Sequence, residues 1–163
     1  MKGKNFTSLL ILNFLIIFFT SELLIAQGSE SWSVRYNGTG SGTDKSNAII
    51  VDNSGNVFVT GSSSGTGLST EDYVTIRYDS SGAEQWVKRY DGLVGSDIAY
   101  AITVDDLGFV YVTGGSMGSG TNYDYLTLKY SPLGDTVWTR KYNGPKNAKD
   151  IAYSKLLMTQ ETF

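Results

Sequence analysis

A motif of the form Trp-x-x-x-Tyr-x-Gly occurs three times in this chain of 163 residues, at a nearly constant spacing. The motifs begin at Trp32, Trp86 and Trp138, so successive copies lie 54 and 52 residues apart. A period of about 50 residues is typical of proteins built from stacked or radially arranged repeats. The chain is therefore expected to fold as an array of similar units.

Acidic and glycine residues recur with the same period. Asp44, Asp97 and Asp150 follow one another at intervals of 53 residues. The segment from Gly61 to Asp72 is one residue longer than its counterpart from Gly114 to Asp124, so the interval between matching residues falls from 53 to 52 after it. That segment is rich in Gly and Ser, which is typical of a surface loop that tolerates changes of length.

Each copy is predicted to form four short β-strands, because β-branched and aromatic residues occur in runs separated by Gly, Asp, Asn and Ser. The chain after its first 26 residues is therefore expected to be all-β. In a four-stranded antiparallel meander, the short turns lie at one end of the sheet and the longer loops at the other. The strands are expected at residues 48–51, 57–61, 73–78 and 85–90 in the first copy, and at 99–104, 109–114, 125–130 and 137–142 in the second.

The short turns carry a recognisable pattern of Asp or Ser at the start and Gly near the end. An opening Asp or Ser accepts hydrogen bonds from the backbone ahead of it, and Gly supplies a positive φ. The segments that begin at Asp52 and Asp105 also look like the start of an EF-hand loop. They lack the closing Glu and run directly into a strand, so turn capping is favoured over calcium binding.

Longer segments of the second copy are also informative: Ala101-Ile-Thr-Val-Asp105, Val110-Tyr-Val-Thr-Gly114 and Asp124-Tyr-Leu-Thr-Leu-Lys-Tyr130. Together with the Trp-x-x-x-Tyr-x-Gly motif, they resemble the SBBP family of β-propeller repeats found in exported bacterial proteins. The resemblance covers residues 31 to about 153. It implies four-stranded blades around a central axis, and it brings no agreed catalytic site.

The chain divides into three parts. Residues 1–26 show the charged, apolar and then polar order of a secretory signal peptide, with cleavage expected after Ala26. Residues 27–153 hold the repeats, as blade-like units at 31–90 and 91–142 and a partial third unit at 143–153; residues 154–163 form a divergent tail. The protein is thus expected to be exported to the periplasm, the cell surface or the medium, with no membrane span after cleavage.

Two blades cannot close a propeller, which needs about four to eight. The fold expected is therefore an incomplete propeller. Three explanations stay open at this point: a truncated or frameshifted reading frame, a short chain that closes by oligomerising, and an open two-blade protein. The last two leave open sheet edges and blade faces, so self-association is expected.

The composition excludes several kinds of chemistry. The chain has no His and no Cys, which removes the Ser-His-Asp triad, thiol chemistry and most zinc sites. Its formal net charge is −3 and its basic residues are dispersed, so no nucleic-acid partner is expected. Because nearly every Asp recurs in each copy, a structural role is favoured over catalysis. Neither a cofactor nor a metal is expected.

The candidate ligand-binding residues lie at the long-loop end of the blades. Asp72, Tyr123 and Asp124 stand where the loop ends, and Asp44 and Asp97 stand just ahead of the innermost strand of each copy. A ring of such Asp residues could hold a cation, but hydrogen bonds to loop amides are favoured. The repeated aromatic residues are expected to pack between blades. Met117 and Tyr123 are expected to be loop residues without counterparts in the first copy.

The function expected from these features is non-catalytic extracellular binding or scaffolding, with a protein or a glycan bound on the long-loop face. Two alternatives remain. One is a fragment of a glycan-active enzyme that uses paired carboxylates, which would need one carboxyl acting as acid and another as base or nucleophile. The other is a non-functional remnant of a longer propeller gene.

Overall fold

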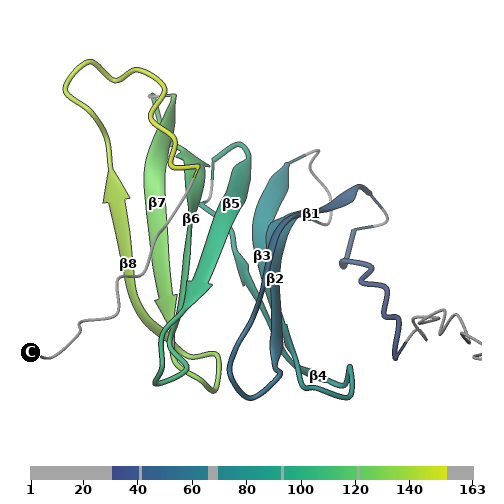
Figure 1. Cartoon of the computed structure of the whole chain (residues 1–163). Helices are drawn as coiled ribbons and strands as arrows, with labels where there is room; N and C mark the ends of the chain where they lie inside the picture. The colour runs from purple at the N-terminus through teal and green to yellow at the C-terminus, as the bar shows by residue number, and fades with distance from the viewer. Residues whose placement is uncertain (1–30, 41, 66–69, 93, 121, 154–163) are drawn as a thin grey trace, which may run out of the picture.

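The computed structural model describes residues 31–40, 42–65, 70–92, 94–120 and 122–153. These residues form two four-stranded antiparallel sheets, with strand orders β1-β2-β3-β4 and β5-β6-β7-β8 (Figure 1). The expected all-β fold of four-stranded propeller blades is confirmed, and the two sheets do not close into a ring. The predicted signal peptide at 1–26 and the divergent tail at 154–163 lie outside the described residues.

Each sheet is formed by consecutive strands of one repeat, and the sheets are called blade 1 and blade 2 below. Blade 1 consists of β1 (Asp44–Val51), β2 (Val57–Ser64), β3 (Glu71–Tyr78) and β4 (Glu84–Tyr90). Blade 2 consists of β5 (Asp97–Val104), β6 (Val110–Met117), β7 (Tyr123–Tyr130) and β8 (Thr136–Tyr142). Within the described residues, no helix is long and apolar enough to cross a membrane.

Six of the strands extend further toward the long-loop end than the sequence pattern predicts. The added residues are mostly polar, and they continue the antiparallel pairing, as in the Ser64↔Glu71 pair of blade 1 and the Met117↔Tyr123 pair of blade 2. The expectation that Met117 and Tyr123 are loop residues without counterparts is therefore wrong. They end β6 and begin β7, and Ser64 and Glu71 are their counterparts.

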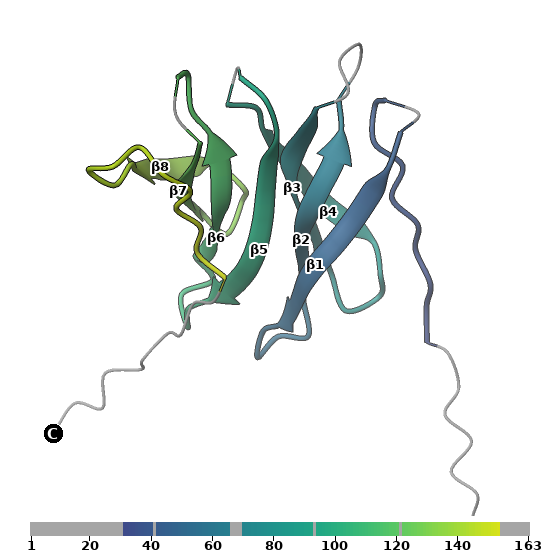
Figure 2. The same ribbon diagram turned by 90° about the horizontal axis from the view of Figure 1, so that it is seen from above.

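The short turns all lie at one end of the two sheets, and the longer connections leave from the other (Figures 1 and 2). In the first turn, Asp52 Oδ1 accepts hydrogen bonds from the amides of Ser54 and Asn56, both at 2.9 Å. Gly55 has a φ of 79°, which favours glycine. The interpretation of Asp52 as a turn cap is confirmed.

The main hydrophobic core lies between the two blades. Trp86 of blade 1 packs with Phe58 on one side and with Tyr130 of blade 2 on the other, at ring-centroid distances of 6.2 and 5.9 Å. The Tyr73 hydroxyl donates a hydrogen bond to the Leu126 carbonyl across the same interface. Burial of large aromatic side chains dominates the energy of such a core. The repeated aromatic residues of blade 1 therefore hold the two blades together, as expected.

Residues outside the two sheets continue the repeat pattern at both sides. Trp32 packs on Tyr78 of blade 1 at a centroid distance of 6.0 Å, much as Trp86 packs on Tyr130. On blade 2, the Asp150 amide donates to the Tyr123 carbonyl at 2.6 Å. The segments before β1 and after β8 thus occupy positions that belong to neighbouring repeats.

A matched pair of substitutions tests the interface core. Trp86→Ala should lower the free energy of unfolding by about 3–5 kcal/mol, the usual cost of removing a buried Trp. Trp138→Ala, at the same repeat position on the more exposed side of blade 2, should cost clearly less. Urea unfolding followed by circular dichroism measures both values. Equal losses would contradict the assignment of the core to the interface between blades.

Candidate functional site

An acidic row crosses each blade at its long-loop end. In blade 1, Asp44 of β1 pairs with Ser63 of β2, and Ser63 pairs with Asp72 of β3. The Arg89 guanidinium closes this row, since its Nη2 lies 2.8 Å from Asp72 Oδ2 and its Nη1 donates to Ser63 Oγ at 2.8 Å. Asp44 is the first residue of β1, so it lies within the strand and not ahead of it.

Blade 2 repeats this arrangement with one change of residue type. Asp97 of β5 pairs with Ser116 of β6, and Ser116 pairs with Asp124 of β7. Lys141 replaces the arginine, with its Nζ 3.6 Å from Asp124 Oδ2. Asp97, like Asp44, begins its strand. The two rows share one design, with an acid on the first and third strands and a cation on the fourth.

The first acid of each row binds the glycine that ends the Trp-x-x-x-Tyr-x-Gly motif. The Gly38 amide donates to Asp44 Oδ2 at 3.1 Å, and the Gly92 amide donates to Asp97 Oδ2 at 2.6 Å. The Gly144 amide does the same to Asp150 Oδ2 at 2.8 Å. The predicted role of these Asp residues in binding loop amides is therefore confirmed.

Steric contact explains why this position is glycine. A Cβ atom on Gly92 would lie 2.7 Å from Asp97 Oδ1 and 2.9 Å from both Asp97 Oδ2 and Ser116 Oγ. These separations are too short for a side chain, so the close approach of backbone and carboxylate requires glycine. The same contact fixes the path of the chain as it leaves one blade and enters the next.

Asp97 is the most buried acid of the candidate residues. Its side chain is fully buried, and its Oδ1 has no hydrogen-bond partner among the described residues. Burial raises the pKa of Asp97 above its ordinary value, and the opposing effects of the Ser116 hydroxyl, the Gly92 amide and Lys141 are smaller. A carboxylate in this position is energetically unfavourable unless another positive group approaches it.

The five predicted residues do not form a single site. Asp72 and Asp97 come together between the blades, and each has a carboxylate oxygen within 4.8 Å of the other. Asp44 instead lines the cavity on the open side of blade 1, and Asp124 lies in blade 2 beside Lys141. Tyr123 is partly exposed beside Asp124, with Lys149 Nζ 5.8 Å from the centre of its ring.

The basic residues of the rows were missed by reasoning from the sequence. The signal was present, because Arg35, Arg89 and Lys141 all directly precede the Tyr of the repeated motif. Asp91 was also missed, although it lies beside Asp72 and Asp97. It stands where the other two copies have Asn37 and Asn143, so it does not share the repeat pattern that directed attention to the other acids.

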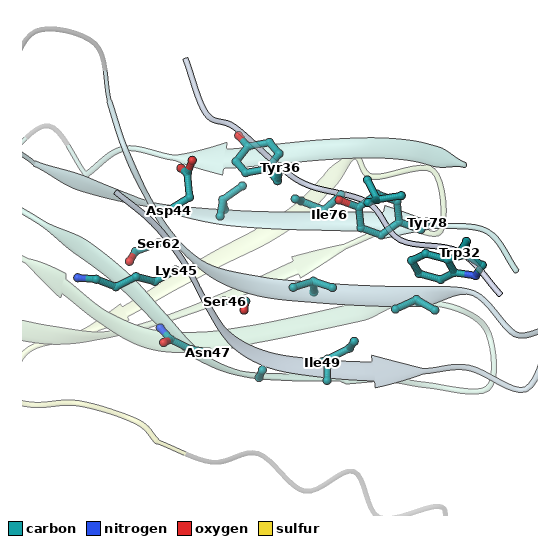
Figure 3. A pocket seen from close by; sticks show the side chains of 15 residues that line it. Trp32, Tyr36, Asp44, Lys45, Ser46, Asn47, Ile49, Ser62, Ile76 and Tyr78 are labelled. Atoms are coloured by element: carbon teal, nitrogen blue, oxygen red, sulfur yellow. The ribbon is translucent and has the colours of Figure 1, made fainter. Parts of the chain in front are cut away.

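The open face of blade 1 contains a cavity of about 510 Å³ (Figure 3). Its walls are apolar along most of their length, with Val57, Val74 and Ile76 from the sheet and Trp32 from the segment before β1. Asp44 and Lys45 lie at its long-loop end. The cavity could therefore receive apolar side chains, and its polar end borders the acidic row.

Comparison with known proteins identifies the repeats. A family model named SBBP and described as a beta-propeller repeat matches residues 32–69 and 85–120. The matched segments begin at or beside Trp32 and Trp86 and run past the ends of β2 and β6. A search of curated proteins found no match.

The raised pKa of Asp97 predicts how stability changes with pH. An acid whose pKa is higher in the folded than in the unfolded protein lowers stability as pH rises from its unfolded pKa through its folded pKa. Asp97→Asn should therefore become more stable relative to the wild type as pH rises above about 4, the ordinary pKa of Asp. Urea unfolding in EDTA at pH 3.5 to 7 measures the difference. A difference that stays constant with pH would contradict the prediction.

Proposed function

Because this chain carries β-propeller repeats of the SBBP family, we propose that it is an exported, non-catalytic binding and scaffolding module whose open blade faces bind further blades of the same kind. One observation carries the proposal. The open face of blade 1 presents the same repeat positions that blade 2 buries against blade 1.

The covered face of blade 2 receives aromatic side chains from blade 1. Phe58, Tyr73 and Trp86 pack on a surface formed by apolar residues of β5, β6 and β7. Ile102 of this surface is only 8% exposed. The other residues of the surface are Ala99, Val110, Val112, Leu126, Leu128 and Tyr130.

The open face of blade 1 has the corresponding residues under a thinner cover. Trp32 and Tyr36 pack against its buried residues Val57, Val74, Ile76 and Tyr78, but no second sheet of the described residues lies over them. Ile49 stands at the position of Ile102, but it is 68% exposed. The cavity lies over this face (Figure 3). By repeat equivalence, it corresponds to the space that Phe58 and Tyr73 fill between the two blades. The residues equivalent to Val110, Val112, Leu126, Leu128 and Tyr130 are Val57, Val59, Val74, Ile76 and Tyr78.

Blade 2 exposes the complementary surface on its other side. Tyr125 is 39% exposed, whereas its counterpart Tyr73 is fully buried. Tyr111 and Trp138 stand at the positions of Phe58 and Trp86, and they pack on each other at 6.2 Å. A second copy could therefore place its blade 2 on the open face of blade 1. The interface would be head-to-tail, since the two contacting surfaces differ.

The segment before β1 already covers part of the surface that a second copy would bind. Trp32 occupies the position on blade 1 that Trp86 occupies on blade 2, as their stacking on Tyr78 and Tyr130 shows. The segment 31–38 belongs to no sheet among the described residues. An arriving four-stranded blade would displace it. A partner that supplies only three strands would instead use it as a fourth.

The acidic rows support a non-catalytic role. Asp72 and Asp97 are buried, and each already has a structural contact, with Arg89 and with the Gly92 amide. A glycosidase needs two carboxyl groups that reach the substrate, so the enzyme alternative is disfavoured. Binding of a protein or a glycan at the long-loop end remains part of the proposal. Export rests on the signal-like order of residues 1–26.

Charge substitutions on the two faces test the proposal. The wild-type protein should self-associate at tens of micromolar, whereas Ile49→Glu and Tyr125→Glu should each be mainly monomeric, because each buries a carboxylate in the interface. An equimolar mixture of the two variants should form dimers, since each retains one intact face. Size-exclusion chromatography with light scattering measures all three masses.

The matched control is Leu133→Glu, which places the same charge at an exposed apolar residue of the turn between β7 and β8. It should associate as the wild type does. A monomeric wild-type protein, or a mixture of the two face variants that stays monomeric, would refute head-to-tail blade binding.

A further inference from the structure

Three acidic side chains from different segments meet where blade 1 joins blade 2. Asp72 comes from β3, Asp91 from the link after β4, and Asp97 from the start of β5. One carboxylate oxygen from each lies within 4.8 Å of the others. Like charges this close oppose ionisation unless positive charge is nearby. Arg89 supplies one such charge by bonding to Asp72, and Lys141 acts on Asp97 from a greater distance.

A second observation shows that the existing partners leave part of this cluster unsatisfied. Asp97 is fully buried, and its Oδ2 is taken by the Gly92 amide, but its Oδ1 has no hydrogen-bond partner among the described residues. The Ser116 hydroxyl is buried beside it, within hydrogen-bonding reach of the Asp97 carboxyl and of the Tyr90 hydroxyl. Asp97 Oδ1 and Ser116 Oγ both lie within 3 Å of the point where a Gly92 Cβ would stand, so they face the link that carries Asp91.

An unpaired carboxylate oxygen in a buried site carries a large desolvation cost. The cost disappears if a cation coordinates the oxygen. A cation that satisfies Asp97 Oδ1 in this way must fit among oxygens that come from three segments of the backbone.

The donor set selects the kind of cation. All the available donors are carboxylate or hydroxyl oxygens, which suit hard ions and not zinc or copper. Calcium binds oxygens at about 2.3–2.6 Å, so its ligands can lie up to about 5 Å apart. Magnesium binds at about 2.1 Å and spans only about 4.2 Å. Calcium also accepts irregular sets of oxygen ligands, whereas magnesium needs near-ideal octahedral geometry, so oxygens from three separate segments favour calcium.

The other copies of the repeat lack one of the three acids. Asp44 and Asp150 take the place of Asp97 and bind the glycine amide in the same way. At the position of Asp91, however, these copies have Asn37 and Asn143. The third carboxylate thus distinguishes the junction between blades 1 and 2 from the two neighbouring positions.

We propose that Asp72, Asp91 and Asp97 bind a Ca²⁺ ion at the long-loop end of the junction, with the Ser116 hydroxyl beside it and water completing the coordination. The ion neutralises the cluster and connects β3 of blade 1 to β5 of blade 2. It therefore strengthens the contact between blades in addition to the hydrophobic core. Few protein ligands contribute, so the affinity belongs to the weak class of extracellular calcium modules, with a Kd of about 10⁻⁴–10⁻³ M.

Asp91→Asn tests the site with little risk to the fold, because asparagine is the natural residue at this position in the other copies. The wild-type chain, stripped with EDTA, should bind one Ca²⁺ per chain by isothermal titration calorimetry, and its Tm should rise with CaCl₂ up to 10 mM. Asp91→Asn should weaken Ca²⁺ binding at least tenfold and lose most of the Tm increase. MgCl₂ at the same concentrations should produce a smaller increase.

Asp106→Asn is the matched control, since it removes the same charge from an exposed turn at the opposite end of blade 2. It should bind Ca²⁺ as the wild type does. The proposal is overturned if the wild-type chain binds no Ca²⁺ at 10 mM, if Asp91→Asn binds as tightly as the wild type, or if Asp106→Asn loses binding to the same extent. The last result would indicate attraction by net charge alone.

Discussion

A four-stranded sheet of this kind has apolar side chains on both faces, and each face must be covered by another layer. This constraint governs the whole structure. At the interface between the blades, aromatic side chains from one repeat fill a surface of smaller aliphatic side chains from the next. The two surfaces of a blade are therefore different in shape, and a single sequence motif supplies both. For this reason Trp and Tyr recur in the sequence about every 53 residues.

Reasoning from the sequence predicted the features that depend on local patterns. Runs of β-branched and aromatic residues located all eight strands, and the Asp and Gly residues of the turns located the hairpins. It predicted strands that are too short at the long-loop side, because Ser63, Asp72 and Asp124 have little β-propensity and are held there by pairing and by Arg89 or Lys141. It predicted that the repeated aromatic residues pack between blades, but it did not predict which polar side chains meet there. The proximity of Asp91 to Asp72 and Asp97 depends on how one sheet lies on the next, and spacing along the chain does not determine that.

The acidic rows connect the stability of the blades with their proposed roles. In each row the first acid binds a backbone amide of the preceding link, and the third strand's acid faces a basic side chain of the fourth strand. These contacts hold the ends of the strands where hydrophobic packing is weaker. They also concentrate negative charge at the end of the molecule that presents the long loops. A binding role there can coexist with a structural one, because Arg89 and Lys141 neutralise only part of that charge.

The link between repeats has a further consequence for how such chains can change during evolution. Each copy contains one half of the interface with the copy before it and the complementary half of the interface with the copy after it. Duplication of one period in the gene therefore inserts a whole blade and reproduces every contact, including the bond between glycine and aspartate. Duplication of a fraction of a period would leave a tryptophan without its facing tyrosine. Genes of this type can thus gain or lose blades readily, but only in whole units.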